Sequence, residues 1–316
     1  NISSRCRPTS MIRPDNPYFA QVRLLVAVLP IVARERCFAL KGGTAINLFV
    51  RDMPRLSVDI DLAFVPIGDR ASALEAIDAA LGRISEILAG RPYGYRVSVG
   101  KRQDGSAYGL LVSDRAAEIK IEVSPVLRGS VYPESMRRIV DRAEAEFGFA
   151  EVPVVSFADL YAGKIVAALD RQHPRDLFDV KLLLAEEGIS DELFRAFLVY
   201  LISHDGSIAR VLNPTRKPLE DLFERQFAGM TVEAVTVDEL DRARADLIAA
   251  LHQRLGEREK AFLMSFKRGE PGWDLLGVAH AADLPAVRWK LQNLAQMSRE
   301  KHREALDNLE RVLGNI

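Results

Sequence analysis

The sequence predicts an α/β (α+β) fold in which a mixed or antiparallel sheet is followed by a helical region. Segments with the period-two alternation of strands are concentrated between residues 38 and 126, and some are separated by only a few turn residues. From Ser156 onward the apolar residues recur at helical spacing. We therefore divide the chain into a sheet domain, 1–155, and a helical domain, 156–316.

The composition is that of a globular protein. The 316 residues, 48% hydrophobic and 28% charged, suffice for two packed units. No apolar stretch reaches the roughly 18 residues of a membrane span, and no signal peptide is visible, so we expect a cytoplasmic protein without membrane contact. Cys6 and Cys37 cannot form a disulfide framework, and the five histidines show no zinc-binding spacing, so any metal should have oxygen ligands.

Charge is balanced over the whole chain but not locally. The net charge of −1 gives no global sign of nucleic-acid binding. Residues 1–58, however, contain nine basic and three acidic side chains, which indicates either a basic approach to a phosphate-binding cleft or ordinary surface variation. The basic residues are Arg5, Arg7, Arg13, Arg23, Arg34, Arg36, Lys41, Arg51 and Arg55.

The first elements follow from capping residues and periodicity. Asn16-Pro17 is typical of a helix start, and Pro30 should kink or stop that helix after about Leu29. Residues 38–41 precede two glycines and predict a strand entering a tight turn. The next elements are a short helix at 44–50, a strand at 58–65, a helix at 72–89 capped by Ser72, and strands at 95–99, 108–112 and 118–126.

The turn at residues 103–106 favours a hairpin between two of these strands. In the helical region, Ser156 with Asp159 resembles a capping box. Long amphipathic runs predict helices at 237–267 and 299–313.

The segment from Lys41 to Phe64 carries the strongest functional signal. On a strand, Asp59 and Asp61 share a face with Ser57. Two neighbouring carboxylates repel each other unless a cation lies between them, which favours a hard divalent ion such as Mg²⁺.

The glycines before this strand suit phosphate. Gly42 and Gly43 allow the backbone to approach a ligand closely, and a helix beginning at Thr44 directs unpaired N–H groups toward the same space. The alternative is a surface turn beside an unrelated acidic strand. Glu122, on a strand with Glu118 and Lys120, is either a third metal-binding carboxylate or an exposed strand residue.

A second group of charged residues surrounds Pro174. This proline should end one helix near Asp170 and start another, which Gly188 closes. The charges face either a ligand or one another in a salt-bridge network. They are Lys164, Arg171, Arg175, Asp176 and Asp179.

With these two groups in place, the chain resembles the AbiEii/AbiGii family of nucleotidyltransferase toxins, within the polymerase-beta-like nucleotidyltransferase superfamily. The resemblance spans most of residues 20–310. It is carried by the segments GGTAINLF, PRLSVDIDL, EIKIEV, KIVAALDRQHPRDLFDVKLL, FLMSFKRGEPGWDLL and LPAVRWKLQNL.

The resemblance implies roles for individual residues. Asp59 and Asp61 would bind Mg²⁺ and the triphosphate beside Gly42 and Gly43, and Glu122 occupies the place of a third acid. The downstream lysine corresponds to Lys164 and the downstream acid to Asp176 or Asp179, between which the sequence does not choose. Expected nucleotide-binding residues are Gly42, Gly43, Thr44, Ser57, Lys164, Arg171 and Arg175.

The resemblance also implies an activity. We expect a toxin of a toxin-antitoxin, abortive-infection-type system that transfers NMP from an NTP to RNA, such as the tRNA 3′ end, and has a cognate antitoxin. In some relatives a serine at the position of Ser57 is phosphorylated. The alternatives are transfer to a protein or small molecule, and an NTP-binding regulatory protein without turnover.

Overall fold

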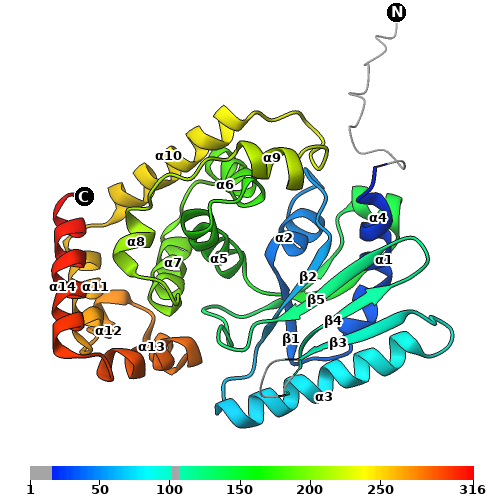
Figure 1. Cartoon of the computed structure of the whole chain (residues 1–316), viewed down its shortest axis with the longest axis horizontal. Coiled ribbons are helices and arrows are strands. Elements are labelled where there is room, and N and C mark those ends of the chain that lie inside the picture. Colours follow the sequence, from blue (N-terminus) through cyan, green and yellow to red (C-terminus); the bar gives the residue numbers. More distant parts are fainter. Residues whose placement is uncertain (1–15, 102–104, 106) are drawn as a thin grey trace, which may run out of the picture.

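The structure is a computed structural model that describes residues 16–316 except 102–104 and 106 (Figure 1). Some sequence-based predictions therefore lie outside the described residues. They concern Cys6, Arg5, Arg7, Arg13 and all of the 103–106 turn except Gly105.

The described strands form one mixed seven-stranded sheet in the order β3-β4-β5-β2-β1-β7-β6. β2 runs antiparallel to β1 and parallel to β5, β1 runs parallel to β7, and the β3-β4 hairpin is antiparallel as predicted. The strands are β1 (Phe38–Lys41), β2 (Asp59–Phe64), β3 (Arg96–Lys101), β4 (Ala107–Ser113), β5 (Glu118–Val123), β6 (Ser135–Arg138) and β7 (Glu151–Val154).

The two faces of the sheet differ. On β5, Ile119, Ile121 and Val123 are buried on the face that contacts α1, while Lys120 and Glu122 are exposed on the opposite face. Figure 1 shows α3 lying along β3 and β4, which it contacts. Hydrophobic burial thus fixes the register, because a slip of one residue would turn the apolar side chains to solvent.

The helices of the sheet region differ from prediction at their ends. α1 passes through Pro30 instead of stopping there, since a proline in the last turn interrupts few remaining hydrogen bonds. α2 starts at Gly42, two residues early, and continues as a π-helix. Asp69, not Ser72, caps α3, by accepting the Ser72 N–H. These helices are α1 (Phe19–Val32), α2 (Gly42–Ala45), the π-helix (Ile46–Val50), α3 (Arg70–Ala89) and α4 (Asp141–Phe147).

Beyond β7 the described elements are helical. Ser156 caps α5 as predicted, and Pro174 opens α6. The single helix predicted for 237–267 is two helices, because the chain bends at Leu255 and Gly256. The α-helices are α5 (Phe157–Asp170), α6 (Pro174–Glu186), α7 (Asp191–Ser203), α8 (Ile208–Leu212), α9 (Glu220–Gln226), α10 (Val237–Arg254), α11 (Glu257–Arg268), α12 (Trp273–Leu276), α13 (Pro285–Ala295) and α14 (Arg299–Gly314).

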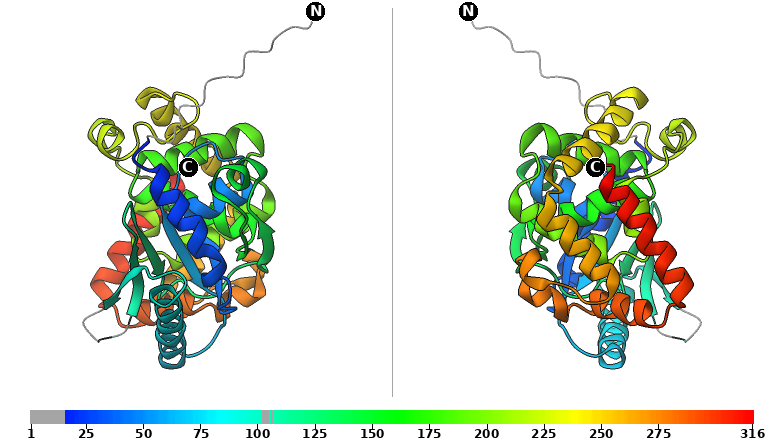
Figure 2. Two further views of the ribbon diagram at one scale, coloured as in Figure 1. Left: turned by 90° about the vertical axis from the view of Figure 1, so that its right-hand side faces the viewer. Right: turned by 90° about the vertical axis from the view of Figure 1, so that its left-hand side faces the viewer.

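The two regions pack together. Buried apolar side chains from both belong to one continuous cluster, which extends from Phe19 to Leu313. A short backbone pairing reinforces this contact. The Leu56 N–H donates to the Met230 carbonyl at 2.8 Å, and Arg55 forms an isolated antiparallel β-bridge with Thr231. Figure 2 shows α14 on the outer side of the helical region, away from the sheet. None of the described helices combines the length and hydrophobicity needed to cross a membrane.

Candidate active site

The glycine turn and the acidic strand are in direct contact. Gly42 has φ +74°, and a Cβ at this position would lie 2.3 Å from Asp61 Oδ2. A Cβ at Gly43 would lie 2.9 Å from Ser57 Oγ. Any side chain would displace the neighbouring polar group, so both glycines are needed for the close approach of α2 to β2.

The two carboxylates lack strong partners. The Asp59 side chain is 39% exposed, and its only ion pair among the described residues is a long contact of 3.7 Å with Arg175 Nη1. Burial, followed by repulsion from Asp61, raises the pKa of the Asp59 carboxyl above its ordinary value, although Arg175 and Lys120 oppose the shift. The pair therefore presents oxygen ligands whose repulsion a cation would relieve.

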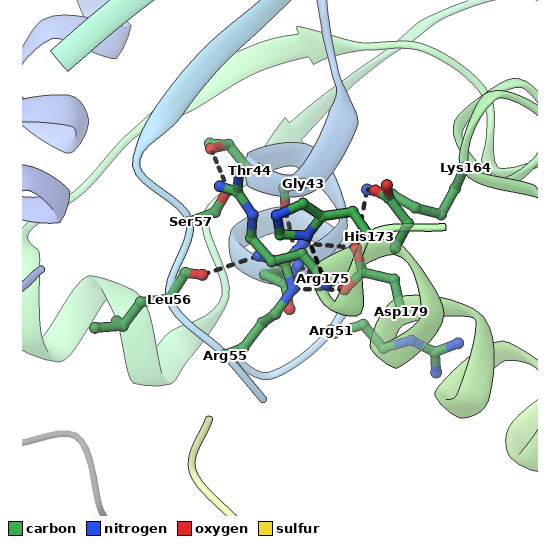
Figure 3. A network of polar contacts seen from close by, with 12 residues as sticks. Gly43, Thr44, Arg51, Arg55, Leu56, Ser57, Lys164, His173, Arg175 and Asp179 are labelled. Atoms are coloured by element: carbon green, nitrogen blue, oxygen red, sulfur yellow. Dashed lines mark hydrogen bonds and ion pairs between the residues drawn. The ribbon is translucent and has the colours of Figure 1, made fainter. Parts of the chain in front are cut away.

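Thr44 and Ser57 hold the strand in place. The Thr44 hydroxyl donates to the Asp59 backbone carbonyl at 2.6 Å and lies 3.1 Å from Ser57 Oγ. Thr44 is completely buried and Ser57 nearly so. Figure 3 shows Ser57 beside the start of α2. These hydroxyls position the acidic strand relative to the glycine turn.

The second group of charged residues forms a network around two buried aspartates, and Arg171 joins it from the surface. Lys164 Nζ lies 2.8 Å from Asp176 Oδ1 and 3.1 Å from Asp179 Oδ2. Arg171 binds Asp176 through Nε and Nη2, at 2.5 and 2.9 Å. Burial alone would raise the pKa of Asp176, but Lys164 and Arg171 outweigh it and hold the pKa well below its usual range.

Asp176 and Asp179 are both fully buried. Each already accepts hydrogen bonds from cationic side chains, so the structure places both at the base of the site and does not single out one of them. The salt-bridge network that the sequence left as an alternative is present. It also leaves Arg175 directed toward Asp59.

Sequence reasoning assigned no site role to Arg55 and Asn47. Arg55, 1% exposed, binds Asp179 through Nε and Nη2 at 2.8 and 2.6 Å, and its third nitrogen donates to the Leu56 carbonyl (Figure 3). Asn47 bridges the Gly43 carbonyl and Asp179. Together they tie the glycine turn to α6. No local pattern in the sequence marks either residue as part of the site.

Two arginines of the basic N-terminal segment form internal ion pairs. Arg51 is buried against the Tyr161 hydroxyl and pairs with Glu186 and Glu187. Together with Arg55, it joins the sheet region to the helical region and does not line a basic surface.

Glu122 lies beside the carboxylate pair, because it is the register partner of Asp61 on β5 and shares its face. Lys120 is likewise paired with Asp59. No three His, Cys, Asp or Glu side chains within the described part of the chain are grouped closely enough to hold a metal ion. A metal-binding role for Glu122 stays a prediction.

A cavity of about 340 Å³ opens beside Asp61. Its walls come from Lys41 and Gly42 on one side and from α5 and α7 on the other, with Lys164 and Arg171 among the lining residues. The site thus combines a pair of carboxylates, a glycine turn and a cavity lined by both basic and acidic side chains.

The fold is similar to that of a known nucleotidyltransferase toxin. In the solved structures, the nucleotidyltransferase toxin MenT4 from Mycobacterium tuberculosis matches with a TM-score of 0.59 and 16% identity, over 94% of this chain and 95% of that one. At this identity the likeness establishes the fold. No curated protein matches the sequence.

Residues 23–293 match the family described as "Nucleotidyl transferase AbiEii toxin, Type IV TA system". This match covers most of the chain, including both groups of charged residues. The protein is a nucleotidyltransferase and belongs to the AbiEii family of toxins of type IV toxin-antitoxin systems.

Proposed function

We propose that this toxin is a Mg²⁺-dependent enzyme that transfers NMP from an NTP to an RNA acceptor such as the tRNA 3′ end. The observation that carries the metal dependence is the placement of Asp59 and Asp61 against the Gly42 turn. Family membership implies an NTP substrate and a cognate antitoxin. An RNA acceptor and a cytoplasmic location agree with the resemblance described above.

The donor set fits magnesium. Mg²⁺ binds through one or two carboxylates and completes its shell with water and substrate phosphates, so the absence of a three-acid group within the described residues does not conflict with it. When bound, the metal would neutralise charge on the triphosphate and lower the barrier for displacement at the α-phosphate.

The protein residues orient the substrates. The glycine turn admits the phosphates close to the backbone, and Arg175 adds positive charge beside Asp59. Asp176 and Asp179 hold Lys164 in one position at the base of the site. The acceptor hydroxyl attacks the α-phosphate, the bond to the β-phosphate breaks, and pyrophosphate leaves.

Label transfer tests this function. The protein is incubated with each α-labelled NTP, Mg²⁺, total RNA and cell protein, and label should appear in RNA. Asp59→Ala should lower transfer by about 10³-fold or more, because the metal is expected to supply several kcal/mol of transition-state stabilisation. The distant surface variant Asp307→Ala serves as the control. Label in protein, or full activity of folded Asp59→Ala, would contradict the proposal.

A further inference from the structure

The sheet face that carries the acidic pair continues across β5 onto the β3-β4 hairpin. Asp61 is paired in register with Glu122 on β5. Glu122 is paired in turn with Gly109, and Gly109 with Gly100. Paired residues share a face, and Gly109 lies two strand spacings, roughly 10 Å, from Asp61. The row thus leads from a carboxylate to two positions without side chains.

A β-bulge turns Tyr108 to this face. Gly100 is paired with Gly109 but Lys101 with Ala107, so Tyr108 is an extra residue between the two pairs. A regular strand would direct Tyr108 to the buried face, because its neighbour Gly109 lies on the open one. Instead, a Cβ at Gly100 would lie 2.8 Å from the Tyr108 ring, so the ring covers Gly100 on the open face. Bulges commonly redirect a side chain beside an active site.

The bulge and the two glycines border a hollow of about 250 Å³ beside the carboxylate pair. Its walls include Tyr108, which is 39% exposed, together with Lys120 and Glu122. Lys120 and Glu122 are the register partners of the two aspartates, so the hollow adjoins the carboxylates directly. A ligand there would meet an aromatic ring and an ammonium group within reach of the reaction centre.

A second hollow, of about 520 Å³, continues along the same face toward the start of β5. The two hollows share Ser98 and Leu111, which are paired with each other. Arg96 lines the second hollow, and so do Asp114 and Glu118. Together the two hollows form one groove, here called the hairpin groove, which carries both basic and acidic side chains.

We propose that the hairpin groove binds the unpaired end of the RNA acceptor, with the terminal base against Tyr108 and its sugar hydroxyl toward Asp59 and Asp61. The inference rests on the proposed transfer to RNA and adds the surface that receives this substrate. Unpaired bases commonly stack on aromatic side chains that a sheet presents on its open face. Lys120 contacts a backbone phosphate, and the two glycines let the nucleotide lie close to the strands.

The groove favours RNA over a protein acceptor. A peptide commonly binds a sheet by adding a strand at a free edge. β4 and β5 each have a neighbouring strand on both sides, so no edge is open at the hollow beside the carboxylates. An exposed ring above two glycines instead suits a flat group such as a nucleobase.

Steady-state transfer from an α-labelled NTP to total tRNA tests the stacking contact. Tyr108→Leu removes the ring but keeps an apolar side chain, and should raise the KM for tRNA about tenfold or more, a usual effect of losing a base–aromatic stack. The KM for the NTP should not change. Tyr108→Phe keeps the ring and should behave like the wild type. Tyr93→Leu is the matched control, since Tyr93 is 36% exposed and lines neither hollow.

Salt dependence tests the phosphate contact. Binding of tRNA is measured on filters at several salt concentrations. Lys120→Met should lower the slope of log affinity against log salt by about 0.7, the value for one phosphate contact on a single strand. Lys301→Met, at an exposed position of α14, should keep the wild-type slope. A wild-type slope in Lys120→Met would contradict the assignment.

Photocrosslinking gives an answer even if a variant fails to fold. Irradiation of the wild-type protein with tRNA that ends in 8-azidoadenosine should label peptides of β3 and β4. Crosslinks confined to the helical region, or an unchanged KM for tRNA in folded Tyr108→Leu, would overturn the assignment. Label transfer to protein that Tyr108→Leu reduces would show that the groove takes a protein acceptor instead. Absence of any nucleotidyl transfer by the wild type would refute the proposed function, whereas normal transfer with an unchanged KM would refute only the role of the groove.

Discussion

The site contains two pairs of aspartates in opposite surroundings. Asp176 and Asp179 are fully buried and paired with cationic side chains. In contrast, Asp61 lines a cavity, and Asp59 is partly exposed with only a long contact to Arg175. Cations lower the pKa of the buried pair, but burial and mutual repulsion raise that of Asp59. The difference teaches that residue type alone does not assign a role. Asp176 and Asp179 have their countercharges within the protein, whereas Asp59 and Asp61 lack close cationic partners among the described residues.

Removing a buried carboxylate should have the largest effect on stability. Asp179→Ala leaves Arg55 and Lys164 without one of their countercharges, at a cost of about 3–5 kcal/mol. Urea unfolding followed by circular dichroism measures this loss. Asp59→Ala should unfold at nearly the wild-type urea concentration. If both variants lose the same stability, the distinction between the two pairs is wrong.

Acid should weaken the buried pair selectively. Because Asp176 has a folded pKa below its unfolded value of about 3.9, its contribution to stability is complete above that pH and is lost as the pH falls through the folded pKa. Asp176→Asn should therefore show a flatter decline in unfolding free energy below about pH 4 than the wild type. Parallel curves at every pH would show that Asp176 does not contribute through its charge.

Substitution of the glycine turn should have a smaller effect on stability but a clear one on activity. Gly42→Ala costs about 1–2 kcal/mol for the left-handed backbone and also displaces the Asp61 carboxylate. Gly229→Ala is the matched control, since its φ is +78° and no atom lies near its Cβ position. Both should lose similar stability, measured by thermal unfolding, while only Gly42→Ala loses nucleotidyl transfer. Equal activity would mean that the Gly42–Asp61 contact is unimportant.

Much of the site was predictable because its signals are local. The period-two pattern placed Asp59 and Asp61 on one strand, and Pro174 marked the start of α6. The strands β6 and β7 were missed because they are short, and β7 contains Pro153, which argues against a strand. Their pairing is decided by tertiary contact with β1.

Long-range pairing was the part that sequence could not supply. Arg55 and Asp179 are separated by 124 positions, and no local pattern distinguishes a buried arginine from a surface one. The choice between a ligand site and a salt-bridge network around Lys164 also depended on burial. The salt-bridge network is present, since the acids pair internally and Arg175 faces Asp59, while a ligand-binding role for these charges stays a prediction.

The pairing of Leu56 with Met230 has a consequence for the order of synthesis. The strand that carries the acidic pair is anchored by backbone contacts to residues that the ribosome adds about 170 positions later. The ion pair between Arg55 and Asp179 likewise can form only after Asp179 has been synthesised. A nascent chain should therefore lack a complete site until the residues around Met230 have been made, and the cell would have that interval before the toxin could act.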